Sequence, residues 1–222
     1  MKDNKKHKKA EYGILITGLI ILLAVACIIA LCAGQYSVSV PEVTKILASR
    51  FVNVTKTWSN TAEGVVFTLR LPRIIGAVLV GSALSLSGAA YQGVFKNPLV
   101  APDLLGVSSG ACVGASVAIL LHLNSFGVQA MAFVAGILAV GLTLFIPRLI
   151  KNTNMTMLVL SGIIVKGIMD SVMGIIKYVA DPETELQSIT YWQLGSLTKV
   201  LPKDLFTVGP VIVAASVIIF LL

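Results

Sequence analysis

The feature that most constrains this chain is a set of apolar runs, each long enough to cross a lipid bilayer as a helix. A transmembrane helix needs about 20 apolar residues, because the hydrocarbon core is roughly 30 Å thick and offers backbone groups no water. Six such runs occur, at residues 14–34, 74–92, 104–123, 126–147, 155–176 and 205–222. The sequence therefore predicts an all-α, polytopic membrane protein with a single transmembrane domain over residues 14–222, preceded by a basic tail at residues 1–13.

Composition supports this class. Hydrophobic residues make up 56% of the chain and charged residues only 12%, too few for the polar surface of a soluble protein. The net charge of +7 is compatible with nucleic-acid binding, but the basic residues are spread between the runs and form no aromatic-basic module. The tail carries five lysines before the first run, so we expect a cytoplasmic N-terminus.

Several patterns that carry chemistry elsewhere lack their context here. The sequence GVSSG at residues 106–110 matches a nucleophile elbow with Ser108 as the nucleophile, but no strand precedes it, and the only histidines are His7 in the tail and His122 at the end of a run. No phosphate-binding G-x-x-x-x-G-K-[ST] motif is present, so any ATP chemistry must come from a partner. Cys27, Cys32 and Cys112 form no CxxC pair. We therefore expect no catalytic residue, no disulfide, no bound metal and no cofactor.

The glycines of the same region have a different interpretation. Gly106, Gly110 and Gly114 recur every four residues, which clears one helix face for the close approach of a neighbouring helix. We therefore expect them to serve helix packing.

Two charged residues fall inside the fifth run. Lys166 and Asp170 stand one helical turn apart, and each intramembrane charge costs about 2.5–3.5 kcal/mol on insertion scales. Two hypotheses remain open: a mutual pair that neutralises itself, or a polar patch on a substrate pathway.

Two segments between the runs suggest surface helices. In SVPEVTKILASRF, Ser39 and Glu42 have the spacing of a capping box, and the apolar residues fall on one face that we expect to lie on the membrane. Further along, Tyr191 and Trp192 suit a membrane interface.

One block of the sequence has a specific resemblance. LRLPRIIGAVLVGSALSLSGAAYQGVFKNPLVAPDLLGVSSGACVG, residues 69–114, resembles the signature region of FecCD-type permeases, and LVLSGIIV (158–165) and YWQLGSL (191–197) also match. Such permeases are membrane subunits of ABC importers for iron–siderophore complexes, haem and cobalamin. The resemblance implies import of a metal chelate across the cytoplasmic membrane of a bacterium, by alternating access and without chemistry on the substrate.

The resemblance also implies partners and residue roles. The partners would be two cytoplasmic ATPase subunits, an extracytoplasmic binding protein and a second permease subunit, identical or different. Arg70 and Arg73 match positions that receive acidic residues of the binding protein. The remaining matches are two segments of a cytoplasmic gate: Asn97, Pro98 and Leu99 in one, Met155 and Thr156 in the other.

The sequence departs from the family pattern in two ways. Family members have ten spans, so we expect this chain to be incomplete after the sixth, and Lys166 and Asp170 add charge to the fifth. Two alternatives follow: an ion-coupled secondary transporter that uses these two charges, and a non-functional remnant of a permease.

Overall fold

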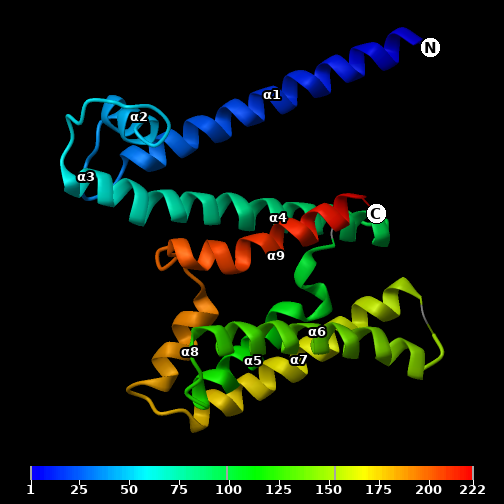
Figure 1. Cartoon of the computed structure of the whole chain (residues 1–222). Coiled ribbons are helices and arrows are strands. Elements are labelled where there is room, and N and C mark those ends of the chain that lie inside the picture. Colours follow the sequence, from blue (N-terminus) through cyan, green and yellow to red (C-terminus); the bar gives the residue numbers. More distant parts are fainter. Residues whose placement is uncertain (1, 99, 153, 222) are drawn as a thin grey trace. The chain divides into compact units, whose positions relative to one another are not determined.

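The computed structural model of the chain describes residues 2–98, 100–152 and 154–221, with side chains from residue 11 onward (Figure 1). Over these ranges every regular element is a helix, so the predicted all-α fold is confirmed. Three residues with a predicted place, Met1 of the tail, Leu99 of the first gate segment and Leu222 of the last run, lie outside the described residues. The chain divides into two compact units.

The helical elements follow one another along the chain. They are α1 (Lys2–Cys32), α2 (Val40–Ala48), α3 (Asn60–Gly64), the π-helix η1 (Val65–Arg70), α4 (Leu71–Phe95), the 3-10 helix η2 (Pro102–Leu105), α5 (Val107–Leu120), α6 (Ser125–Leu149), α7 (Met155–Val179), α8 (Glu185–Leu194) and α9 (Pro202–Leu221).

Among the described residues, five helical stretches are long and apolar enough to cross a membrane. They lie at Glu11–Cys32, Asn60–Phe95, Ser125–Leu149, Met155–Val179 and Pro202–Leu221. Most of their side chains are exposed within the chain, as expected of helices that face lipid or further protein. The third predicted span, at residues 104–123, is not among these long helices, because α5 has only 14 residues and is about 21 Å long.

Two predicted boundaries at the start of the chain differ from the structure. The basic tail is not a separate segment, because α1 begins at Lys2 and runs without a break into the first span. The second span does not begin at Ile74, because α3, η1 and α4 are continuous from Asn60. The wider π turn directly before Pro72 lets the helix continue past this proline.

The first unit contains residues 1–80 and 197–213. Its core joins the C-terminal end of α1 to α2, α3 and η1 through buried apolar side chains: Leu31, Val38, Val43, Ile46, Trp58, Ala62 and Val66. The expectation that one face of residues 39–51 lies on the membrane is therefore wrong for Val43 and Ile46, which pack into this core. The Ser39 capping box does not form either, since the Ser39 side chain makes no cap hydrogen bond.

The second unit contains residues 81–196 and 214–222. Figure 1 shows α5, α6 and α7 running alongside one another, with α8 beside α5. Met173 and Ile176 of α7 share a buried cluster with Ala180 and with Ile189 of α8. The α5 helix is short because Gly106 adopts a left-handed conformation, with φ of 73°, and separates it from η2.

Candidate functional site

The irregular segment at residues 96–106 lies between α4 and α5 and contains Asn97, Pro98 and Gly106, three of the residues singled out in the sequence. It leaves α4 at Phe95, and Lys96 takes a positive φ of 48°. Phe95, Val100 and Leu105 are buried together, and Leu158 and Val159 of α7 pack against them. The described residues of the two predicted gate segments, Asn97 and Pro98 in one and Met155 and Thr156 in the other, are thus close in sequence to members of one apolar cluster.

Two contacts fix the end of this segment against α6 and α7. A β-carbon on Gly162 of α7 would overlap the carbonyl oxygen of Leu104, so the backbones meet there without an intervening side chain. The hydroxyl of the buried Thr143, on α6, donates to Leu105 O at 3.0 Å. Because Gly162 comes seven residues after the start of α7, this contact lies about 10 Å along that helix. The segment therefore enters the depth spanned by α7.

Lys166 forms an ion pair with a residue of this segment. Its Nζ lies 3.7 Å from Asp103 Oδ2, and both side chains are about half exposed. Asp170 makes no hydrogen bond or ion pair within the described part of the chain, so the mutual Lys166–Asp170 pair does not form. Sequence reasoning missed Asp103 as a partner because Asp170 was the near neighbour on the same helix.

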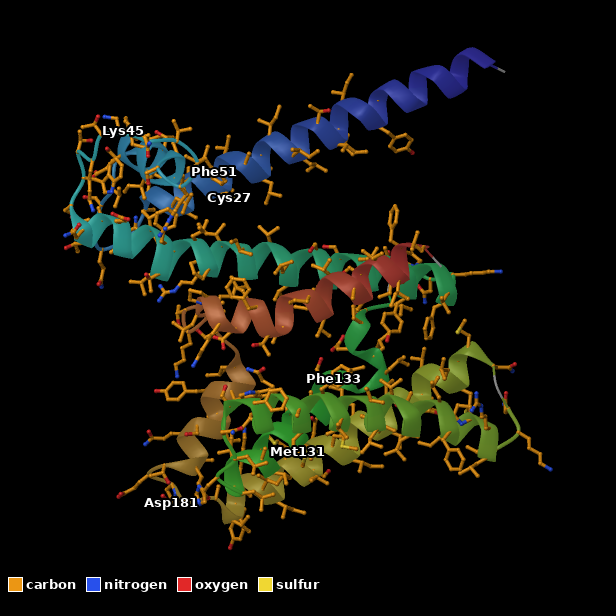
Figure 2. The ribbon with its side chains drawn as sticks, viewed as in Figure 1. Cys27, Lys45, Phe51, Met131, Phe133 and Asp181 are labelled. Atoms are coloured by element: carbon orange, nitrogen blue, oxygen red, sulfur yellow. The ribbon has the colours of Figure 1, made fainter. Side chains whose placement is uncertain are left out.

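The glycines of α5 lie against its neighbours. A β-carbon on Gly110 would come within 2.5 Å of Ala139 Cβ and 2.9 Å of Ala135 O, both on α6. At Gly114 a β-carbon would come within 2.5 Å of Ala135 Cβ and overlap the Met131 carbonyl oxygen. Figure 2 labels Met131 on this helix. Gly106 instead packs against Val165 of α7, so the three glycines do not share one partner helix.

The two arginines of the first unit have different surroundings. The Arg70 guanidinium is buried and donates to Leu31 O at 2.6 Å, to Cys32 O at 3.2 Å and to Tyr36 O. Arg73 is partly exposed, and its buried Nε has no hydrogen-bond partner among the described residues. Docking through Arg70 would therefore require three hydrogen bonds to be exchanged, whereas Arg73 has none to lose.

The remaining gate residues are exposed. Asn97 and Pro98 follow the end of α4, and Met155 and Thr156 form the first turn of α7 after Asn154.

The serine motif has no catalytic surroundings. Ser108 lies in the first turn of α5, preceded by η2 rather than by a strand. His122 stands beyond the other end of that helix and pairs with Glu185 at 3.5 Å. Across the described residues no three His, Cys, Asp or Glu side chains are grouped to hold a metal ion.

Sequence reasoning also missed Thr143 and Gly162. Gly162 lies in a stretch that carried the family resemblance, but its role depends on a backbone contact that no local pattern encodes. Thr143 is a polar residue surrounded by apolar ones in the run at residues 126–147, and this isolation is the sequence signal that could have identified it.

These features define a polytopic helical membrane protein with a short, interrupted helix and polar groups at membrane depth. Comparison with known sequences gives a match over residues 22–222 to the FecCD transport family, and the chain belongs to that family.

Several relatives of the chain are named for the transport of different solutes. The molybdate import system permease protein of Haemophilus influenzae is 33% identical over 212 residues, which is 95% of this chain and 62% of that protein. A permease protein of Helicobacter pylori named for iron chelatin transport is 40% identical over 63% of this chain and 42% of its own length. The cobalamin import permease of Halobacterium salinarum is 36% identical over 72% of this chain and 43% of its own length.

A solved structure also matches. It is described as a metal-chelate type ABC transporter in an inward-facing conformation, with a TM-score of 0.78 and 29% identity. The match covers 93% of this chain and 61% of that one. The chain thus spans less than two thirds of the length of these relatives.

Proposed function

We propose that this chain acts as a permease subunit of an ATP-binding-cassette importer that moves a metal-bearing solute across the cytoplasmic membrane. The observation that carries the proposal is the family match over residues 22–222, supported by the fold similarity to a metal-chelate type transporter. Transport would proceed by alternating access, driven by the different affinities of two states of the assembly for ATP.

The cargo we favour is an iron–siderophore complex or a related metal chelate such as haem or cobalamin. Relatives named for iron chelatin, hemin and cobalamin support this class, and the molybdate relative adds an oxyanion to the candidates. Shared family membership does not distinguish these cargoes, so the choice among them is made by measured uptake.

The proposed partners are cytoplasmic ATPase subunits, an extracytoplasmic binding protein and a second permease subunit. The proposed gate comprises residues 97–99 and 155–156. Its described residues are close in sequence to a buried cluster that includes Val100 and Leu158. Lys166 and Asp170 belong to the proposed pathway, with Lys166 balanced by Asp103.

The test is an uptake assay with the full-length protein. We would express it with its ATPase and binding protein in cells lacking their own permeases of this family, and measure uptake of radiolabelled ferric siderophore, haem, cobalamin and molybdate. We expect uptake that survives an ionophore and is lost when the phosphate-binding lysine of the ATPase is replaced. Uptake lost with the ionophore but retained with the inactive ATPase would favour the ion-coupled alternative. No uptake of any of these solutes would contradict the proposed class of cargo.

Docking of the binding protein makes a first prediction. The family resemblance relates both Arg70 and Arg73 to docking, and we propose Arg73, the partly exposed one of the two, for direct contact with the partner. We expect Arg73→Glu to weaken docking at least about tenfold, because a carboxylate would then face the acidic side chain of the partner. Binding to detergent-solubilised protein measures this. Arg148→Glu, on α6, is the matched control, and equal affinities for both variants would contradict the prediction.

A further inference from the structure

The side chain of Arg70 lies where it can hold the end of another helix. Leu31 and Cys32 are the last two residues of α1, and the final carbonyl groups of a helix have no partner within it. Arg70 donates to both of these carbonyl oxygens and to Tyr36 O in the turn beyond. A cation at this end of a helix also interacts favourably with the helix dipole.

A side chain at Gly34, opposite Arg70, would meet the guanidinium group. Gly34 has a φ of 149°, and a β-carbon there would lie 2.6 Å from Arg70 Nη2 and 3.3 Å from its Cζ. The guanidinium group thus fills the space beside Gly34, in direct contact with the turn that leads from α1 to α2. This close approach is a second observation, separate from the hydrogen bonds, that ties Arg70 to the same turn.

The π-helix accounts for the direction of the side chain. Ala62, Val66 and Arg70 are all buried, at intervals of four residues. In an α-helix each interval of four residues turns about 40° past a full turn, so such a row drifts off one face. A π turn takes up an additional residue, which keeps the row aligned. Ala62 and Val66 then lie in the core of the first unit while Arg70 reaches the end of α1.

We infer that Arg70 is a positioning residue: it fixes the C-terminal end of α1 and the Gly34–Tyr36 turn to the start of α4, and η1 is the device that aims it there. The family resemblance assigns this arginine to docking, whereas this geometry assigns it an intramolecular role. Its effect on any partner passes through the segment at residues 31–70, which we name the cap.

Hydrogen–deuterium exchange on the full-length protein in detergent tests this without substrate or partner. The reporter is the peptide covering residues 27–39, which includes the amide of Ala33 bonded to Ile29 O at 2.8 Å. We expect Arg70→Gln to speed its exchange about tenfold or more, because three hydrogen bonds to carbonyl oxygens are lost. Arg70→Lys keeps the charge, so its exchange rate in this peptide should fall between those of the wild type and Arg70→Gln. Arg73→Gln is the matched control and should leave the peptide unchanged.

A second pair of variants changes the contact without removing the charge. Gly34→Ala should speed exchange in the same peptide, because its β-carbon would displace the guanidinium group and because alanine is strained at the φ of 149°. Gly64→Ala has open space around it and no such φ. Peptides of α5 and α6 should exchange as in the wild type for all variants, since these helices belong to the other unit. If Arg70→Gln cannot be recovered folded, Arg70→Lys and Gly34→Ala decide the question. Equal exchange in Arg70→Gln and Arg73→Gln, or no effect of Gly34→Ala, would overturn the inference.

A docking measurement separates this inference from the proposed function. Of the experiments that test the inference, only this one rests on the proposed function. If Arg70 acts through the cap, the loss of docking in Arg70→Glu is not restored by reversing an acidic residue of the binding protein. If Arg70 contacts the partner directly, one such reversal restores docking, and the inference is overturned. Failure of the proposed function would remove docking altogether but leave the exchange result unchanged.

Discussion

At the scale of single residues, Gly162 shows how one missing side chain determines a contact between segments. A β-carbon at this position would overlap the carbonyl oxygen of Leu104, and backbone atoms cannot move aside as a flexible side chain can. The nearby Gly167 of the same helix has nothing within 4 Å of its β-carbon position. The two glycines therefore have opposite expected responses to the same substitution.

We expect Gly162→Ala to lower the free energy of unfolding by about 1–3 kcal/mol or more, because η2 must shift to admit the methyl group. Gly167→Ala should be neutral or stabilising by up to about 1 kcal/mol, because alanine favours a helix where space is available. Thermal or denaturant unfolding in detergent measures both. Similar values for the two variants would show that η2 is not held against α7 as described.

The ion pair between Lys166, within an apolar span, and Asp103 makes a second prediction at this scale. The Asp103–Lys166 pair is half exposed, so we expect a coupling energy of only about 0.5–1 kcal/mol between the two residues in a double-mutant cycle. Asp103→Asn, Lys166→Gln and the double variant supply the cycle, with unfolding in detergent as the measurement. Asp170→Asn with Lys166→Gln is the control cycle. Stronger coupling to Asp170 than to Asp103 would contradict the pairing.

At the scale of elements, the glycines of α5 set its distance from α6. Gly110 and Gly114 leave no space for a side chain between the two helices, and Ala135 and Ala139 supply small residues on the facing side. Close packing of small residues replaces the hydrophobic effect as a source of helix association in lipid, because lipid tails are as apolar as the side chains.

A cross-link between the two helices tests this packing. In a variant whose native cysteines are replaced, Ala111→Cys and Gly136→Cys should form a disulfide on oxidation, since a β-carbon at Gly136 would lie 3.7 Å from Ala111 Cβ. Adding Gly114→Leu should reduce the cross-linked fraction severalfold by separating the helices. Adding Gly141→Leu, on α6 with open space around it, is the matched control. An unchanged yield with Gly114→Leu would refute the close contact.

For the molecule as a whole, we propose an orientation in the membrane from the basic residues near the N-terminus. Positive flanks resist translocation, so we propose that the five lysines before the first span keep that end in the cytoplasm. With α1 crossing once, the connection between α2 and α3 would face outward. If η2 and α5 together count as one crossing, the four crossings by α1, α4, η2 with α5, and α6 would return the connection between α6 and α7 to the cytoplasm.

Cysteine labelling checks this orientation. Phe51, labelled in Figure 2, is 90% exposed, and Asn152 is also exposed. With the native cysteines replaced, Phe51→Cys should react with a membrane-impermeant maleimide in intact cells. Asn152→Cys should react only after the membrane is permeabilised. The reverse pattern would place the N-terminus outside.

Much of the fold could be predicted from the sequence, and less of the site. The positions of five long spans followed from apolar length, and the resemblance of residues 69–114 identified the family. The shortening of α5 was missed because Leu104 and Leu105, the last residues of the 3-10 helix, continue the apolar run, and the break depends on the left-handed conformation at Gly106. The capping box at Ser39 was wrong, while Ser59, which was not singled out, accepts from Ala62 N at 3.0 Å.

The class and the spans could be predicted from the sequence, because in lipid each segment must satisfy its own backbone hydrogen bonds and is therefore recognisable by its apolar length. The family was predicted from the specific resemblance of residues 69–114. Which polar groups meet depends on the tertiary structure. Arg70 bonds to Leu31, 39 residues away, and Lys166 pairs with Asp103 rather than with its neighbour Asp170. Partners so distant are brought together by the packing of whole helices, which depends on contacts such as the one between Gly162 and Leu104 that no local pattern encodes.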